Sequence, residues 1–164
     1  MPKLALRLAL VSAALAVTAS SARAQTATAT IAVTATVVPS CTIAGAPVAF
    51  GNYDPVVTNA AAALNASGTV TVTCTRGTTY SVGLGAGNST SGSRAMRHAT
   101  LTDELPYQLY QDAARTTVWT DAAMISGTAT STAAVSYPVY GSIPSGQDVP
   151  TGDYADAVIA TVNF

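Results

Sequence analysis

The sequence feature that most restricts the fold is a two-residue alternation of apolar and polar side chains. Between residues 26 and 38, small apolar residues take the odd positions and threonine takes most of the even ones. The same alternation returns in four later segments, residues 68–75, 80–84, 133–143 and 154–164. A side-chain period of two is typical of β-strands, whereas a helix needs a period of about 3.6 residues. Beyond residue 24 no segment has the helical period, so the sequence predicts an all-β protein.

Short apolar segments separated by glycine- and proline-rich turns indicate an antiparallel β-sandwich. We interpret the alanine- and asparagine-rich residues 58–67 as a loop. Pro138 lies inside a predicted strand and predicts an edge or a bulge, because proline donates no backbone hydrogen bond. An immunoglobulin-like sandwich has about seven strands, and we count about six, the last of which ends with the chain. We therefore expect an open cleft beside residues 154–164, with unpaired backbone along it.

The first 24 residues have the features of a secretory signal peptide. Lys3 and Arg7 precede an apolar run over residues 8–17, and Ala22 and Ala24 place small residues before a cleavage site. The run is shorter than the roughly 20 apolar residues of a membrane-spanning helix. We expect cleavage after Ala24 and export of the chain, first to the periplasm and then to the cell surface.

The low charge of the chain argues against several classes of partner. Charged residues make up 9% of the sequence, against about a quarter in ordinary soluble proteins. After removal of residues 1–24, four arginines remain against eight acidic residues, which gives a net charge of −4. Binding to nucleic acid or to an anionic membrane needs a basic surface. We therefore expect no nucleic-acid binding and no membrane insertion, and few charges suggest that partners cover part of the surface.

The chain has two cysteines, Cys41 and Cys74. An even number of cysteines in an exported protein indicates a disulfide. Closing a loop of this length stabilises a fold by about 3–4 kcal/mol. Two free thiols or half of a metal site are the alternatives, but no histidine lies near either cysteine in the sequence.

Residues with catalytic or metal-binding chemistry are few and scattered. His98 is the single histidine, and no Gly-x-Ser-x-Gly sequence accompanies it. Asp103 and Glu104 are adjacent, so in a strand they would point to opposite faces. Asp153 and Asp156 could ligate calcium, but a turn residue and a polar strand-edge residue are the favoured interpretation. We expect no enzymatic activity, no catalytic residue, no metal and no cofactor.

Several short motifs follow one another in a fixed order along the chain. They are Cys41, Phe50-Gly-Asn-Tyr53, Val70-Thr-Val-Thr-Cys74-Thr, Tyr80, Arg94-Ala-Met96, Leu105-Pro-Tyr107-Gln-Leu-Tyr110, Trp119, Tyr140-Gly141 and Gly152-Asp-Tyr154-Ala-Asp156 through to Phe164. Together, their order and spacing resemble the spore coat protein U domain family, which includes the Csu-type pilins of archaic chaperone–usher systems. The resemblance covers nearly all of the chain after residue 24.

This resemblance implies an incomplete immunoglobulin-like sandwich that is completed by a donor strand from another protein. A periplasmic chaperone lends the strand first, and an outer-membrane usher then exchanges it for the N-terminal extension of the next subunit. By position, residues 25–34 are the donor extension and residues 35–164 are the pilin domain. The donor residues are Ala27, Ala29, Ile31 and Val33, and the acceptor edge contains Tyr154, Val158, Val162 and Phe164.

These observations favour a structural subunit of a surface pilus or fimbria, in which the polymer supports adhesion or biofilm formation. Each copy gives one strand and receives another, so the contact is head-to-tail and builds an open filament of like subunits. A spore- or cell-coat protein of the same fold is one alternative. A secreted carbohydrate-binding sandwich is another, with Trp119 and the tyrosines as a sugar platform. Most of these aromatic residues occupy alternating strand positions, which favours a role in the core.

Overall fold

The computed structural model describes residues 23–90 and 92–164. The predicted signal peptide therefore lies almost entirely outside the described residues. The chain divides into two compact units, with the boundary between Ala35 and Thr36. In the first unit, residues 23–35 form neither helix nor strand, and the side chains of Ile31 and Val33 are 84% and 90% exposed.

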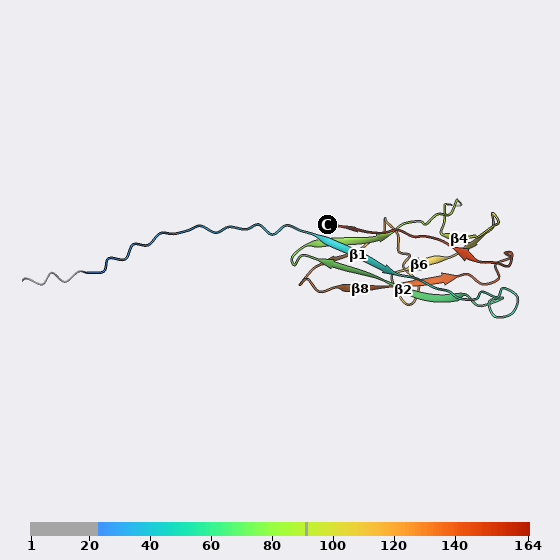
Figure 1. Cartoon of the computed structure of the whole chain (residues 1–164). Coiled ribbons are helices and arrows are strands. Elements are labelled where there is room, and N and C mark those ends of the chain that lie inside the picture. The colour runs from blue at the N-terminus through green and yellow to red at the C-terminus, as the bar shows by residue number, and fades with distance from the viewer. Residues whose placement is uncertain (1–22, 91) are drawn as a thin grey trace, which may run out of the picture. The chain divides into compact units, whose positions relative to one another are not determined.

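The second unit is built from β-strands in antiparallel sheets (Figure 1). One sheet has the order β1-β2-β8-β6, a second β10-β3-β7, and a third β5-β4-β9. The strands are β1 (Cys41–Ala46), β2 (Leu64–Cys74), β3 (Thr79–Leu84), β4 (Ala95–His98), β5 (Glu104–Pro106), β6 (Gln108–Tyr110), β7 (Ile125–Thr128), β8 (Val135–Ile143), β9 (Tyr154–Ala155) and β10 (Ala160–Asn163). The prediction of an all-β antiparallel fold is confirmed. In the described part of the chain, no helix has the length and apolar character that crossing a membrane requires.

The core is formed by the alternating apolar side chains that the sequence predicted. Strand β2 buries Val70 and Val72, and strand β3 buries Val82 and Leu84. Trp119 is fully buried among them, and its indole Nε1–H donates to the carbonyl oxygen of Val82 over 2.9 Å. Because the polar end of the indole is satisfied inside the core, Trp119 is a structural residue, as its sequence position favoured.

The predicted disulfide is present between Cys41 and Cys74. The two residues lie opposite each other in the β1–β2 ladder, with Cα atoms 4.1 Å apart. Strand β1 begins two residues after Pro39, so the alternating residues that precede this proline do not form part of it. The disulfide fastens the first strand of the domain to its neighbour.

One sequence interpretation of the first sheet was wrong, and another holds only locally. Residues 58–67 are not all loop, because β2 already begins at Leu64 and pairs with β8 from there onward. Strand β8, which contains Pro138, is not an edge strand, since it lies between β2 and β6. Strand β6 pairs with β8 only at residues 140–142, so Pro138 lies beyond its end. At that point β8 has a partner on one side only, where a missing backbone N–H is tolerated.

The predicted last strand over residues 154–164 is interrupted. Its first part, β9, pairs with β4, and its last part, β10, pairs with β3, while residues 156–159 belong to no strand. The alternation nevertheless persists through the interruption, because the even-numbered residues from Tyr154 to Val162 are half-buried and the odd-numbered ones are exposed. The segment therefore keeps one face toward the core while it passes from one sheet to another.

Candidate functional site

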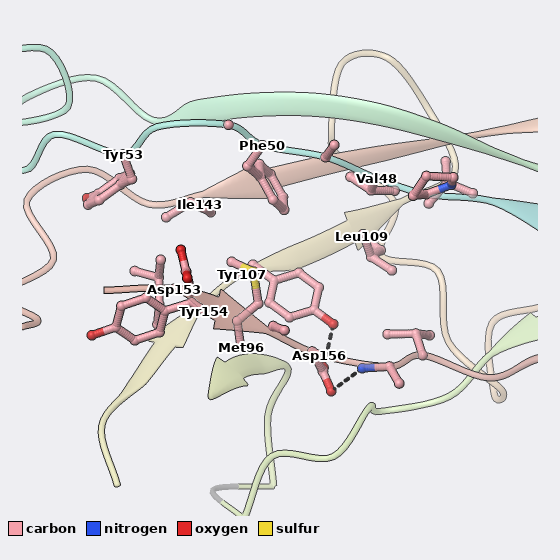
Figure 2. A pocket seen from close by; sticks show the side chains of 18 of the residues that line it. Val48, Phe50, Tyr53, Met96, Tyr107, Leu109, Ile143, Asp153, Tyr154 and Asp156 are labelled. Atoms are coloured by element: carbon pink, nitrogen blue, oxygen red, sulfur yellow. Dashed lines mark hydrogen bonds between the residues drawn. The ribbon is translucent and has the colours of Figure 1, made fainter. Parts of the chain in front are cut away.

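A cavity of about 970 Å³ opens between two chain segments that are distant in the sequence. Residues 45–53, which begin in β1 and continue past it, form the near wall, and residues 149–158 together with Ala160 form the far wall. Figure 2 shows Val48 and Phe50 on the near wall and Tyr154 on the far wall, with Tyr107 between them. The floor is apolar and consists of Leu84, Met96, Leu105, Tyr107, Leu109, Val139 and Ile143. We call this feature the groove.

Both walls of the groove include the edge of a sheet. Strand β1 is the edge of its sheet and pairs with β2, and strand β10 is the edge of another sheet and pairs with β3. The two edge strands lie near each other. Residues 47–53 and 156–159, which continue these walls, belong to no strand. An apolar floor between two unpaired edges is suited to accept a further β-strand.

The near wall is held by side-chain packing. The ring of Phe50 meets the ring of Tyr107 edge-on, with centroids 6.2 Å apart. Phe50 and Val48 also lie directly over Gly141 of β8, where an added Cβ would come within 2.7 Å of Phe50 Cζ and Val48 Cγ1. The lack of a side chain at Gly141 therefore lets Phe50 and Val48 of the near wall pack directly against the sheet.

The far wall is fixed by the carboxylate of Asp156. Tyr107 Oη donates to this carboxylate over 2.6 Å, and the backbone N–H of Asn88 donates to it over 2.8 Å. An added Cβ at Gly87, which has φ +79°, would overlap the same carboxylate. The glycine in this loop is therefore needed for the close approach. Burial first, and then the hydrogen bond to Asp156, raise the pKa of Tyr107 above its ordinary value.

A buried arginine, for which the sequence predicted no role of its own, lies beneath the groove. Arg94 is 4% exposed, and its Nη2 donates to the carbonyl oxygens of Leu84 and Trp119 over 2.8 and 2.7 Å. Nε donates to the carbonyl of Gly85, and Nη1 donates to Gln108 Oε1. Burial lowers the pKa of Arg94. Its one signal in the sequence is that it is among the few charged residues of the chain.

The structure brings together only part of the predicted acceptor edge. Tyr154 and Val158 line the groove. Val162 is half-buried on β10, opposite Val82, and packs against the core. Phe164 is 60% exposed and lies at a shallow hollow over β3 and β7. The near wall and the floor could not be predicted from the sequence, because their residues come from six separate strands and the segments beside them.

The other candidate polar residues have structural contacts. Glu104 accepts hydrogen bonds from Ser89 Oγ and from the backbone N–H of Thr90, over 2.9 and 3.2 Å. The hydrogen bond from the Thr90 N–H is the largest of the effects that lower the pKa of Glu104 below its ordinary value. Asp153 and Asp156 both line the groove, but among the described residues no three histidine, cysteine, aspartate or glutamate side chains lie close enough to hold a metal ion.

Comparison with known proteins adds three findings. Residues 27–161 match the family model described as the Spore Coat Protein U domain. The chain is 40% identical to "Protein U" of Myxococcus xanthus, over 79% of this chain and 80% of that protein. It is similar in fold to a chain in the crystal structure of a CsuC–CsuE chaperone–tip adhesion subunit pre-assembly complex from the archaic chaperone–usher Csu pili of Acinetobacter baumannii. That similarity has a TM-score of 0.58 and 24% identity, over 79% of this chain and 41% of the solved chain. The chain thus spans less than half the length of the solved chain.

Proposed function

Because the chain belongs to the Spore Coat Protein U domain family, we propose that it is a structural, non-enzymatic subunit of a surface pilus assembled by donor-strand exchange. The observation that carries the proposal is the groove, with its apolar floor between two unpaired strand edges. An empty groove of this kind exposes core side chains and backbone groups together, which favours pairing with a further strand.

The donor in this proposal is the extension over residues 25–34 of another copy. Ala27, Ala29, Ile31 and Val33 occupy every second position, so in a strand they share one face. Burying roughly 300–400 Å² of this face at ~25 cal/mol per Å² would contribute about 8–10 kcal/mol before the cost of ordering the strand. Backbone pairing with both edges would add specificity of register.

Several partners follow from the proposal. A periplasmic chaperone would fill the groove before assembly, and an outer-membrane usher would exchange its strand for the extension of the next subunit. The fold similarity to a chaperone–subunit pre-assembly complex supports the first of these partners. Each copy gives and receives one strand, so assembly extends as an open filament at the cell surface. Adhesion and biofilm formation would be properties of that filament.

The experiment that tests the proposal changes the extension and leaves the groove intact. Ile31→Asp in the mature chain places a charge on the apolar face of the donor strand, and Thr30→Asp places the same charge on the opposite face. We expect that the Ile31 variant forms no filaments by negative-stain electron microscopy, whereas the Thr30 variant forms them as the wild type does. Filaments from a chain that lacks residues 26–33 would refute the proposal.

A coat layer built by the same strand exchange is the second candidate, and the description of the matching family favours it. Electron microscopy separates the two, because a pilus gives isolated rods and a coat gives a continuous layer. A sugar-binding platform has less support, since Trp119, Tyr80 and Tyr107 are all buried.

A further inference from the structure

The single histidine of the chain is located at the far wall of the groove. His98 is the last residue of β4 and lies opposite Tyr154 of β9 in the ladder. Strand β9 is only two residues long and pairs with β4 alone. Tyr154 lines the groove, and its ring meets the His98 ring edge-on with centroids 5.0 Å apart. This part of the wall therefore depends on its contacts with His98.

Both nitrogens of the His98 ring have hydrogen-bond partners. Nδ1 accepts the backbone N–H groups of Thr100 and Leu101 over 3.1 and 3.0 Å. A backbone N–H can only donate, so Nδ1 carries no proton, and the proton of the neutral ring is on Nε2. Nε2 lies 3.2 Å from the carbonyl oxygen of Thr151 and donates to it. The ring thus connects the turn after β4 with the far wall of the groove.

The position of the ring is also restricted sterically. An added Cβ at Gly152 would overlap His98 Nε2, so the backbone of the wall passes directly against the ring. Two further backbone hydrogen bonds surround it, since His98 N donates to the carbonyl of Asp103 and Ala99 N donates to the carbonyl of Asp153, each over 2.9 Å. The ring therefore cannot change its hydrogen bonds without moving the turn or the wall.

We propose that His98 is a pH-sensitive latch: its protonation detaches the turn after β4 from the far wall and weakens the hold of the groove on an inserted strand. The inference rests on the proposed function, because it concerns the strand that fills the groove. A proton on Nδ1 would face two N–H donors at 3.1 and 3.0 Å, while the Thr100 hydroxyl oxygen, 3.5 Å away in the same turn, is a more distant acceptor, so the cationic ring cannot keep the neutral arrangement. Histidine is the residue type that changes charge between about pH 5 and 8.

Other charged groups surround the latch and define the controls. Asp103 belongs to the turn and Asp153 to the wall, so each of the two segments that the ring connects contains a carboxylate. Arg97 is the neighbour of His98 on β4 and pairs in the ladder with Glu104 of β5. Asp103→Asn and Asp153→Asn therefore test whether either carboxylate, and not the histidine, is responsible for a pH response.

The latch itself is tested by amide hydrogen exchange of the mature chain at pH 7.5 and 5.5, with rates corrected for the intrinsic effect of pH. In the wild type we expect protection of residues 99–103 and 150–155 to fall roughly tenfold at pH 5.5, because two hydrogen bonds are lost. His98→Gln keeps an acceptor and a donor and does not titrate, so its protection should be equal at both pH values. Equal protection in the wild type, or the same fall in His98→Gln, would overturn the latch. His98→Asn replaces His98→Gln if that variant does not fold.

The effect on strand binding is measured as the dissociation rate of a fluorescent peptide of residues 25–38 from the mature chain. We expect dissociation to be roughly tenfold faster at pH 5.5 than at pH 7.5 in the wild type, and equal in His98→Gln. Strand binding that does not depend on pH in the wild type would overturn the inference and leave the proposed function intact. Absence of strand binding at both pH values would overturn the proposed function and, with it, the role of the latch in strand binding. The hydrogen-exchange measurement would still show whether the contact between His98 and the far wall opens at low pH.

Discussion

Replacing Tyr107 by phenylalanine and Asp156 by asparagine should each destabilise the domain, and the two losses should not be additive. Tyr107 Oη donates to the Asp156 carboxylate over 2.6 Å, and the tyrosine ring is buried. A hydrogen bond with a charged partner contributes about 1.5–3 kcal/mol. Because Asp156 is partly exposed, we expect Tyr107→Phe to lower the free energy of unfolding by about 1.5–2 kcal/mol.

Asp156→Asn should cost slightly more, about 2–3 kcal/mol, because the carboxylate also accepts the backbone N–H groups of Asn88 and Ala157 over 2.8 and 2.7 Å. The amide keeps one acceptor oxygen for these two N–H groups but faces the Tyr107 hydroxyl with its NH2 group, so all three bonds lose their charged acceptor. The double variant loses the bond to Tyr107 only once. The coupling energy of the double-mutant cycle should therefore be about 1–2 kcal/mol.

The measurement is urea unfolding of the mature chain with the disulfide intact at pH 7, extrapolated linearly for the four proteins of the cycle. Tyr110→Phe is the matched control, because the structure gives the Tyr110 hydroxyl no hydrogen bond within the described residues, and its effect should stay within about 0.5 kcal/mol. A coupling energy below about 0.3 kcal/mol would refute the argument that this pair fixes the far wall.

The same variants should also differ in how their stability depends on alkaline pH. Burial and the bond to Asp156 raise the pKa of Tyr107 in the folded state above its ordinary value of 10.0. A raised folded pKa contributes stability that is present below the unfolded pKa and is lost as the pH rises toward the folded value. The wild type should therefore lose stability above pH 10, and Tyr107→Phe should lose less over the same range.

Three further predictions concern loops and the disulfide. Gly87→Ala should lower the free energy of unfolding by about 2–4 kcal/mol, because the added Cβ would overlap the Asp156 carboxylate. Gly92 has a similar φ of +78° but open space around it, so Gly92→Ala should lower the free energy of unfolding by about 1 kcal/mol. Equal losses for the two variants in urea unfolding would contradict the overlap. Cys41→Ser should lower the free energy of unfolding by about 3–4 kcal/mol relative to the wild type with its disulfide intact. The reduced wild type is the control, and its stability should equal that of Cys41→Ser. The backbone N–H groups of Thr117 and then Thr116 lower the pKa of Asp112, so the wild type should lose stability as the pH falls below the ordinary value of 3.8; Asp112→Asn should remove this part of the acid loss in thermal unfolding, and an unchanged acid profile would count against the assignment.

The strands that contain a long alternation of apolar and polar residues were predictable from the sequence. Val70, Val72, Val82 and Leu84 are buried as their spacing required, because a period of two puts every second side chain on one face. The disulfide also followed from the number of cysteines in an exported chain. Strands β1, β4 and β7 were not predicted, and the last two have only four residues each, which is too few to establish a period.

Only one of the two walls of the groove could be predicted from the sequence. The sequence placed Tyr154 and Val158 at an open edge, because their segment is the last alternating one. It could not show that residues 47–53 form the opposite wall, since these residues pair with no strand and have no regular pattern. The interruption after β9 was equally invisible, because it arises from pairing with β4 and β3, whose positions depend on the whole fold.

The disulfide determines how a mechanical load enters the domain. A pull on the N-terminal segment reaches strand β1 at Cys41, its first residue, and the covalent bridge passes the load directly to Cys74 of β2. Strand β2 lies between β1 and β8, so the force is distributed over two ladders. Strand β1 would otherwise detach from the sheet one hydrogen bond at a time from its loaded end. The bridge makes that route of unravelling unavailable, and resistance to tension then depends on the interior of the sheet.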